Sequence, residues 1–197
     1  MINKWNLPLD EIPDGATIGT SSPRRAAFIS NQRPQLIVKH IRGNVDTRIK
    51  KIGNGYDGII LAAAGLKRLN MLDIVDQFID TELFIPDAGQ GAIAIQTRIE
   101  DEETSKIVTK VNHPDTFACV TAERSFMRTI GGNCSTPHAA YAKINKKLIK
   151  IIGLVCSNDG KMQYKETMCG SIDFPEQTGM DLAKKLLNND ALDIEGI

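Results

Sequence analysis

The chain has 197 residues, enough for one large or two small domains with a buried core. Lys plus Arg and Asp plus Glu each total 24, so the formal net charge is zero. This balance disfavours a general nucleic-acid binder, whose affinity depends on excess positive charge, so any anion site must be local. Because no apolar run is long enough to span a bilayer, and the first ten residues lack an apolar core, we expect neither a membrane segment nor a secretory signal.

Strand and helix patterns alternate through the first half of the chain. The predicted strands are 16–22, 36–41 and 58–62, and the predicted helices begin at Pro23, Val45 and Ala63. Ser22 suits the capping position before Pro23, and proline suits the first turn of a helix. Such alternation predicts βαβ units and a parallel-rich sheet, in which ligands bind beyond the carboxyl ends of the strands.

Four arginines follow two of these predicted strands. Arg24 and Arg25 stand in the first turn of a predicted helix, where free N–H groups attract anions, and Arg42 and Arg48 follow the next strand. Arginine binds carboxylate or phosphate through two parallel N–H donors, and nearby hydroxyls such as Thr20 and Ser22 add further donors. The pattern favours a local anion site, although solvated surface arginines are the alternative for each one taken singly.

The second half has a different pattern. A further strand is predicted at 91–98, after a glycine- and proline-rich break, followed by a helix over 116–130 with Cys119, Ala122, Phe126 and Ile130 on one stripe. The remaining predicted elements are strands at 138–144, 147–156 and 162–170 and a helix at 175–188. Turn signals between these strands predict an α+β unit with an antiparallel sheet.

The cysteines and histidines are scattered. No two cysteines form a CxxC pair, so we expect no metal site and no disulfide framework, and we expect reduced thiols in the cytoplasm. Cys119, Cys156 and Cys169 fall in predicted elements and are expected to be packed. Cys134 instead lies in a glycine-rich loop, where its thiol can be reached, and the residues alone leave open whether it is reactive.

Five blocks now stand in a recognisable order. They are Ile18–Arg25 (IGTSSPRR), Ile41–Arg48 (IRGNVDTR), Tyr56–Arg68 (YDGIILAAAGLKR), Pro86–Ala92 (PDAGQGA) and Gly132–Pro137 (GNCSTP). In these blocks the chain resembles the porphobilinogen deaminase (hydroxymethylbilane synthase) family over nearly its whole length. The resemblance implies a periplasmic-binding-protein-like α/β domain with a parallel-rich sheet, plus a C-terminal α+β domain with a three-stranded antiparallel sheet.

The resemblance also implies an activity, a cofactor and a set of site residues. The family are cytoplasmic, monomeric transferases of tetrapyrrole and heme biosynthesis that condense four porphobilinogen molecules into hydroxymethylbilane with release of ammonia. The expected partners are porphobilinogen and the growing polypyrrole, not nucleic acid or membrane. The family's dipyrromethane cofactor is held by a cysteine thioether, which matches Cys134. Its cofactor- and substrate-binding residues match Arg24, Arg25, Arg42, Arg48, Thr20, Ser22, Asn44 and Gln90.

The resemblance further implies a domain arrangement. Residues 1–13 match the crossover from a first domain, 14–85 the second domain, 86–114 a hinge and a remnant of the first domain, and 115–197 the C-terminal domain with the cofactor cysteine. The family's catalytic aspartate has no match here, so we leave the catalytic residue unassigned. We expect these residues alone, as a truncated chain, to have little or no deaminase activity. An unpaired strand at 91–98 would favour self-association.

Two residues depart from the family pattern. Pro23 and His138 stand where the family usually has aliphatic residues. We interpret Pro23 as a helix start and His138 as a loop or strand-start residue, with a cofactor contact as its alternative.

Two other functions are alternatives to the family's activity. A non-catalytic binding module for a small polycarboxylate would use the same arginines and leave Cys134 unmodified. A phosphate or nucleotide binder is weaker, since no P-loop occurs.

Overall fold

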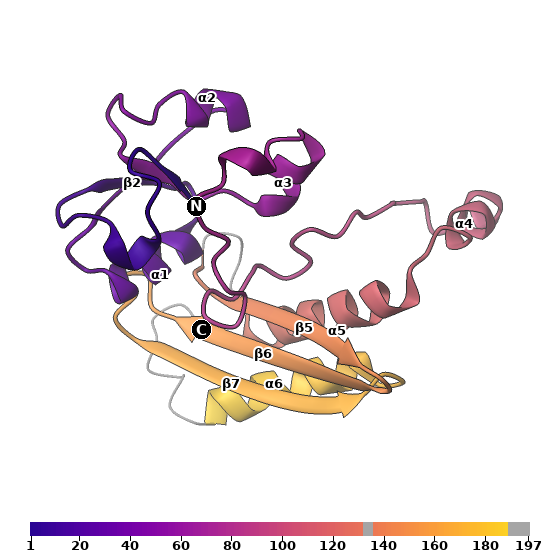
Figure 1. Ribbon diagram of the computed structural model, residues 1–197. Helices are drawn as coiled ribbons and strands as arrows, with labels where there is room; N and C mark the ends of the chain where they lie inside the picture. Colours follow the sequence, from indigo (N-terminus) through magenta and orange to yellow (C-terminus); the bar gives the residue numbers. More distant parts are fainter. Residues whose placement is uncertain (132–135, 189–197) are drawn as a thin grey trace.

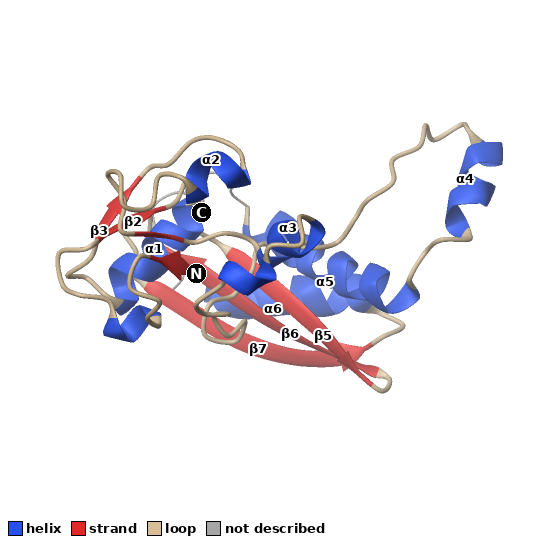
Figure 2. Cartoon of the chain, turned by 45° about the horizontal axis from the view of Figure 1, so that its top comes forward, coloured by secondary structure: helices blue, strands red, loops and turns tan. Residues whose placement is uncertain are grey.

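The computed structural model describes residues 1–131 and 136–188 and shows two lobes joined by an extended segment (Figure 1). The N-terminal lobe contains a small mixed sheet with short helices around it. The C-terminal lobe contains an antiparallel sheet covered by two helices. Between them, a long arm carries one helix away from both lobes (Figures 1 and 2).

The N-terminal lobe has a four-stranded sheet in the order β1-β4-β2-β3. Strands β2, β3 and β4 are parallel, and β1 pairs antiparallel with β4 at the edge. The elements are β1 (Ile2–Asn3), a 3-10 turn (Leu9–Glu11), β2 (Thr17–Gly19), α1 (Pro23–Gln32), β3 (Ile37–Lys39), α2 (Val45–Ile49), β4 (Gly58–Ile59), α3 (Ala63–Arg68) and a second 3-10 turn (Leu72–Ile74). The predicted parallel-rich sheet is confirmed, with strands shorter than their apolar runs.

Local chemistry fixes the start of α1. The Ser22 side chain accepts a hydrogen bond from the backbone N–H of Arg25, and Pro23 occupies the first turn, as its missing N–H allows. The helix then buries Phe28 and Ile29 against Ile18 of β2. This packing fixes the first turn of α1, with Arg24 and Arg25, beside the carboxyl end of β2.

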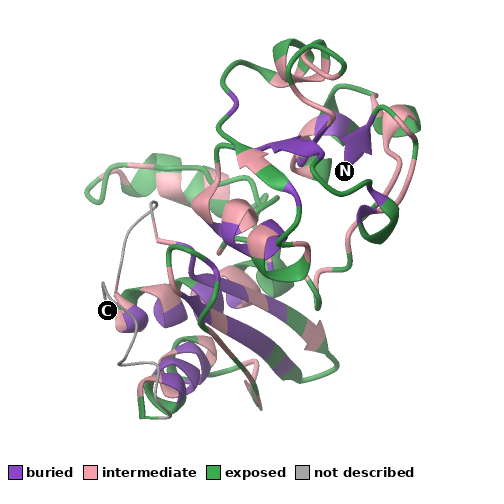
Figure 3. Cartoon of the chain, turned by 90° about the vertical axis from the view of Figure 1, so that its left-hand side faces the viewer, coloured by how far each residue is buried: buried purple, intermediate pink, exposed green. Residues whose placement is uncertain are grey.

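The C-terminal lobe matches its predicted α+β pattern closely. Its elements are α5 (Pro114–Ile130), β5 (Ala139–Asn145), β6 (Leu148–Cys156), β7 (Gln163–Ser171) and α6 (Pro175–Asn188). The sheet order is β5-β6-β7, all antiparallel, and α5 and α6 cover one face of it (Figure 2). Phe126, Ile149, Ile151 and Leu182 are fully buried there, and Figure 3 shows this buried layer between sheet and helices.

One cysteine prediction is wrong. Cys156 is buried and Cys119 is half-buried, but Cys169 is exposed. The reason is strand alternation: Met168 packs into the core, so its neighbour Cys169 faces the other side of the sheet.

The predicted strand at 91–98 is also wrong. No strand forms between β4 and β5 in the described chain, and Ile93 and Ile95 are 79% and 58% exposed. A strand needs a partner edge for its N–H and C=O groups, and none of the described strands pairs with this segment. The arm instead carries an unpredicted helix, α4 (Glu102–Thr109), whose cap is Asp101.

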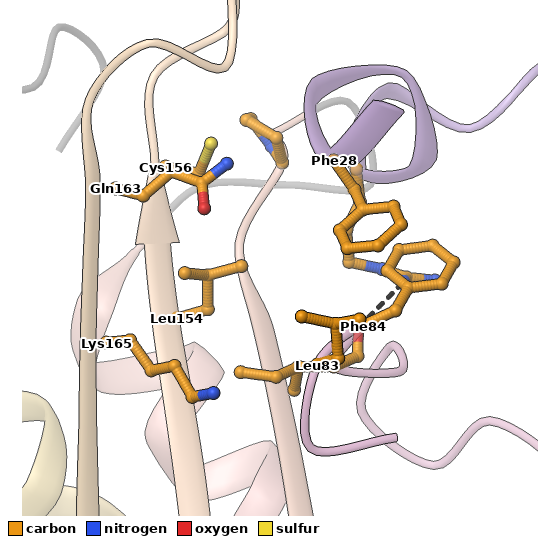
Figure 4. A pocket seen from close by; sticks show the side chains of 10 residues that line it. Phe28, Leu83, Phe84, Leu154, Cys156, Gln163 and Lys165 are labelled. Atoms are coloured by element: carbon orange, nitrogen blue, oxygen red, sulfur yellow. Dashed lines mark hydrogen bonds between the residues drawn. The ribbon is translucent and has the colours of Figure 1, made fainter. Parts of the chain in front are cut away.

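Aliphatic and aromatic contacts join the two lobes beside α1. Ile85 is buried against Ala139 and Ile152 of the C-terminal sheet. The rings of Phe28 and Phe84 stack with centroids 4.2 Å apart. These rings and Leu154 of β6 line a small cavity of about 30 Å³. Figure 4 shows the two rings across from Leu154.

Candidate functional site

Arg24 is a buried cation at the junction of the lobes. The residue is only 6% exposed. Its guanidinium donates to the backbone oxygen of Ile85 at 2.8 Å and to Oε1 of Gln90 at 3.1 Å. The guanidinium also lies over the Phe84 ring. Burial lowers the pKa of Arg24 to about 10, with nearby Asp87 acting in the opposite direction. The group is therefore still charged at neutral pH, and it fixes Gln90 beside α1.

Arg25 and Arg48 form a second pair of cations. Arg25 is half-buried and donates to the backbone oxygen of Ile60 at 2.9 Å. Burial lowers the pKa of Arg25, and the positive charge of Arg48 lowers it further. Arg25 in the first turn of α1 and Arg48 in α2 thus repel each other electrostatically. An anion bound near both would relieve this repulsion.

Arg42 and Asn44 lie on the exposed turn after β3, and Arg48 follows in α2, where it is half-buried. The Asn44 side chain caps α2 by accepting from the N–H of Thr47 at 2.9 Å, and Nε of Arg48 donates to the backbone oxygen of Gly43 at 2.8 Å. Nε of Arg42 lies 3.3 Å from Nε2 of His40. Among the described residues, these contacts use only Nε of each arginine, which leaves the paired terminal nitrogens for a ligand.

Thr20 and Ser22 have structural contacts of their own. Thr20 is buried, and its Oγ1 accepts from the N–H of Ser22 at 3.2 Å, while the Ser22 hydroxyl caps α1. In both contacts the hydroxyl oxygen is the acceptor, so each hydroxyl proton can still be donated.

Gln90 lies in a turn that is anchored by a residue the sequence analysis did not single out. Glu123 of α5 is buried, and its carboxylate accepts from Gly89 N–H at 2.7 Å and from Ala142 N–H at 2.8 Å. Burial raises its pKa, and these two hydrogen bonds oppose the rise. The sequence does contain a pattern that could have indicated a buried role for Glu123. It follows Cys119 by four residues and precedes Phe126 by three, which places an acid on the apolar stripe of the helix.

A cavity of about 480 Å³ opens between α1, the turn after Pro86 and α5. Among the described residues, its lining includes Arg24, Arg124, Arg128 and one acid, Asp87. Arg128 is paired with Glu176 at 2.7 Å. Arg24 and Arg124 together outweigh Asp87, so the lining is positive and suits anionic ligands. Of the predicted residues, Arg24 and Ser22 line it. Arg24, Arg25, Arg42 and Arg48 are called the arginine cluster below. The remaining lining residues are Pro23, Ala88, Met127, Thr136 and His138.

Cys134, the predicted attachment residue, lies outside the described residues. The thiols of Cys119 and Cys156 are poor nucleophiles, because burial raises the pKa of each to about 11. Neither could therefore replace Cys134 as a reactive thiol at neutral pH. Within residues 1–131 and 136–188, no cluster of three metal-ligating side chains occurs.

Two protein-family models match the chain, one over each lobe. Residues 1–106 match the family model described as porphobilinogen deaminase, dipyromethane cofactor binding domain. Residues 117–188 match the model for the porphobilinogen deaminase C-terminal domain. The chain belongs to the porphobilinogen deaminase family. The resemblance that rests on five short blocks is thereby confirmed over both lobes.

Curated relatives agree with the family models. Proteins named porphobilinogen deaminase from Staphylococcus aureus strains JH9, Mu3 and N315 are each 42% identical over 196 residues. The match covers 98% of this chain and 63% of each relative, so the chain spans less than two thirds of their length. Among the described helices, none is both long and apolar enough to cross a membrane.

Proposed function

We propose that these 197 residues form the carboxylate-binding and cofactor-carrying part of a transferase of heme biosynthesis. The proposed reaction condenses four porphobilinogen molecules head to tail, releases ammonia and, after hydrolysis, gives hydroxymethylbilane. A dipyrromethane group bound to Cys134 through a thioether would supply the primer for this condensation. A covalent tether keeps the growing product from diffusing away between additions.

The observation that carries the proposal is the arginine cluster at the ends of β2 and β3, in a chain of this family. Each porphobilinogen unit carries an acetate and a propionate, so the ligand becomes more negative with every addition. Arg24, Arg25, Arg42 and Arg48 would bind these carboxylates, each charge-assisted contact contributing about 1.5–3 kcal/mol. Thr20, Ser22, Asn44 and Gln90 would donate the neighbouring neutral hydrogen bonds. This set of donors fits a dipyrrole with four carboxylates.

We also propose a separate role for each part of the chain. Residues 14–85 would present the arginines, and residues 115–197 would carry the tether at Cys134. Residues 86–114 would act as the hinge between them, with residues 1–13 as a crossover segment. The contact of Arg24 with Ile85 and Gln90 supports this hinge, because it couples a ligand-binding cation to the connecting segment.

The chain assayed alone is expected to have little or no turnover. Asp46, Asp57 and Asp87 are not assigned the role of the family's catalytic aspartate: Asp46 stands in the first turn of α2, and Asp57 is bound to Lys4 at 2.6 Å and to Thr17 N–H. Incubation of the 197 residues with porphobilinogen, followed by assay of hydroxymethylbilane, checks this. Sustained turnover would contradict it.

Binding tests the arginine cluster directly. Calorimetric titration of porphobilinogen into the chain is compared with the same titration of Arg25→Ala and of Arg98→Ala, an exposed arginine on the arm. We expect Arg25→Ala to weaken binding at least about tenfold, because it removes a charged donor, and Arg98→Ala to bind normally. Equal affinity in all three chains would contradict the proposal. Binding of simple dicarboxylates by a chain whose Cys134 is never modified would instead indicate a polycarboxylate-binding module.

A further inference from the structure

His138 has one satisfied and one unsatisfied ring nitrogen. The residue directly precedes β5 and is 3% exposed. Nδ1 lies 3.3 Å from the backbone nitrogen of Cys156 at the end of β6 and accepts its N–H. Nε2 is buried and has no hydrogen-bond partner within the part of the chain that the structure describes.

The first contact fixes the tautomer of the ring. A backbone N–H can only donate, so Nδ1 presents its lone pair, and in a neutral imidazole the proton is then on Nε2. Burial lowers the pKa of His138, which favours the neutral ring at physiological pH. Nε2–H is therefore a buried donor with no acceptor among residues 1–131 and 136–188, and buried donors without an acceptor are rare in folded proteins.

The surroundings indicate which acceptor this donor would meet. His138 lines the cavity of about 480 Å³ together with Arg24, Arg124 and Arg128. Arg128 is paired with Glu176, and Asp87 is the one acid among the described lining residues, so Arg24 and Arg124 leave an excess of positive charge. A carboxylate can accept from a guanidinium and from a neutral N–H at the same time, through its two oxygens.

We propose that His138 is a ligand-binding residue whose Nε2–H donates to a carboxylate held in this cavity beside Arg24 and Arg124. The identity of that carboxylate, an acetate or propionate arm of a pyrrole, rests on the proposed function. Because Nε2 is buried, a side-chain displacement must accompany binding.

Two substitutions separate the ligand contact from the structural one. In His138→Asn the amide oxygen can replace Nδ1 as acceptor for Cys156 N–H, but no donor remains at the Nε2 position. In His138→Gln an amide N–H can reach the Nε2 position. The first variant therefore removes the proposed donor, and the second restores it.

The test combines histidine nitrogen NMR with binding measurements on the 197-residue chain. Long-range proton–nitrogen spectra of the unsubstituted chain should show His138 protonated on Nε2, with this resonance shifting on addition of porphobilinogen or glutarate. Calorimetry with the same two probes should show His138→Asn weakened at least about tenfold and His138→Gln much closer to the unsubstituted chain.

Each outcome either supports or overturns the proposed contact. A response to glutarate but not to porphobilinogen keeps the carboxylate contact and contradicts the proposed function. An Nε2 resonance that neither probe shifts overturns the inference, and so does unaltered binding by His138→Asn. Because the spectra use the unsubstituted chain, a variant that fails to fold does not prevent the decision.

Discussion

Glu123 is the residue that holds the turn at 87–91 against the C-terminal lobe. Its carboxylate satisfies two backbone N–H groups, Gly89 and Ala142, at a buried position. Since each buried donor left without an acceptor costs about 1–3 kcal/mol, we expect Glu123→Ala to lower the free energy of unfolding by about 2–4 kcal/mol. Urea unfolding followed by circular dichroism measures this. Glu102→Ala, at an exposed residue of α4, is the control and should cost little.

His138 should make stability depend on pH. Its pKa in the folded chain is lowered by burial, while the unfolded chain has the ordinary value of 6.5. Below that value the unfolded state takes up the proton first, so the free energy of unfolding falls as the pH drops toward the folded pKa. Unfolding measured from pH about 7.5 to about 5.5 should show this loss.

The His138→Asn variant tests whether this residue causes that pH dependence. Without the imidazole, the loss below about pH 6.5 should shrink. The same slope in His138→Asn and in the unsubstituted chain would show that His138 does not titrate differently in the two states.

At the scale of elements, the packing of α6 on α5 depends on Gly179. A Cβ at this position would meet the backbone oxygen of Ala122 and lie 3.0 Å from the nitrogen of Phe126. Gly179→Ala must therefore push the two helices apart and should destabilise the C-terminal lobe by about 1–3 kcal/mol. Gly65→Ala is the control, because a Cβ on α3 meets nothing within 4 Å. There alanine should be neutral or stabilising by up to about 1 kcal/mol, and thermal unfolding of both variants checks the contrast.

The elements differ in how far their sequences determine them. β5, β6 and β7 have alternating side chains and clear turns, so local pattern places them within one or two residues. The segment 91–98 has the same apolar alternation, yet it forms no strand, because pairing depends on a distant edge and not on local sequence. β1 was missed for the related reason that its two residues are defined only by their pairing with β4.

The residues of the candidate site also differ in how far local sequence predicts them. The places of Arg24, Arg25, Arg42 and Arg48 in the fold were predictable, because strand ends and helix starts can be read from local sequence; their role in binding stays a prediction. Glu123 was not singled out, and His138 was noted only as a loop or strand-start residue with a cofactor contact as the alternative, because the importance of both comes from burial against residues that are distant in sequence. Their hydrogen-bond partners, Gly89 and Cys156, lie 34 and 18 residues away.

At the scale of the whole molecule, the arm exposes apolar side chains that nothing in the described chain covers. Ile93, Ile95 and Ile99 are 79%, 58% and 95% exposed. Unpaired backbone next to exposed isoleucines favours association with other copies, so sedimentation velocity should show larger species as concentration rises. The double variant Ile93→Ser with Ile95→Ser should associate less, whereas Leu69→Ser outside the arm should not change the distribution. A chain that stays monomeric at all concentrations would contradict this.

The central claim is that Cys134 carries a dipyrromethane beside an arginine cluster. The most direct measurement is the intact mass of the chain purified from a heme-producing host, with peptide mapping and an Ehrlich colour test. We predict an added dipyrrole mass on the peptide that contains Cys134, a positive colour reaction, and loss of both in Cys134→Ser. An unmodified Cys134 thiol, with no colour reaction, would contradict the claim.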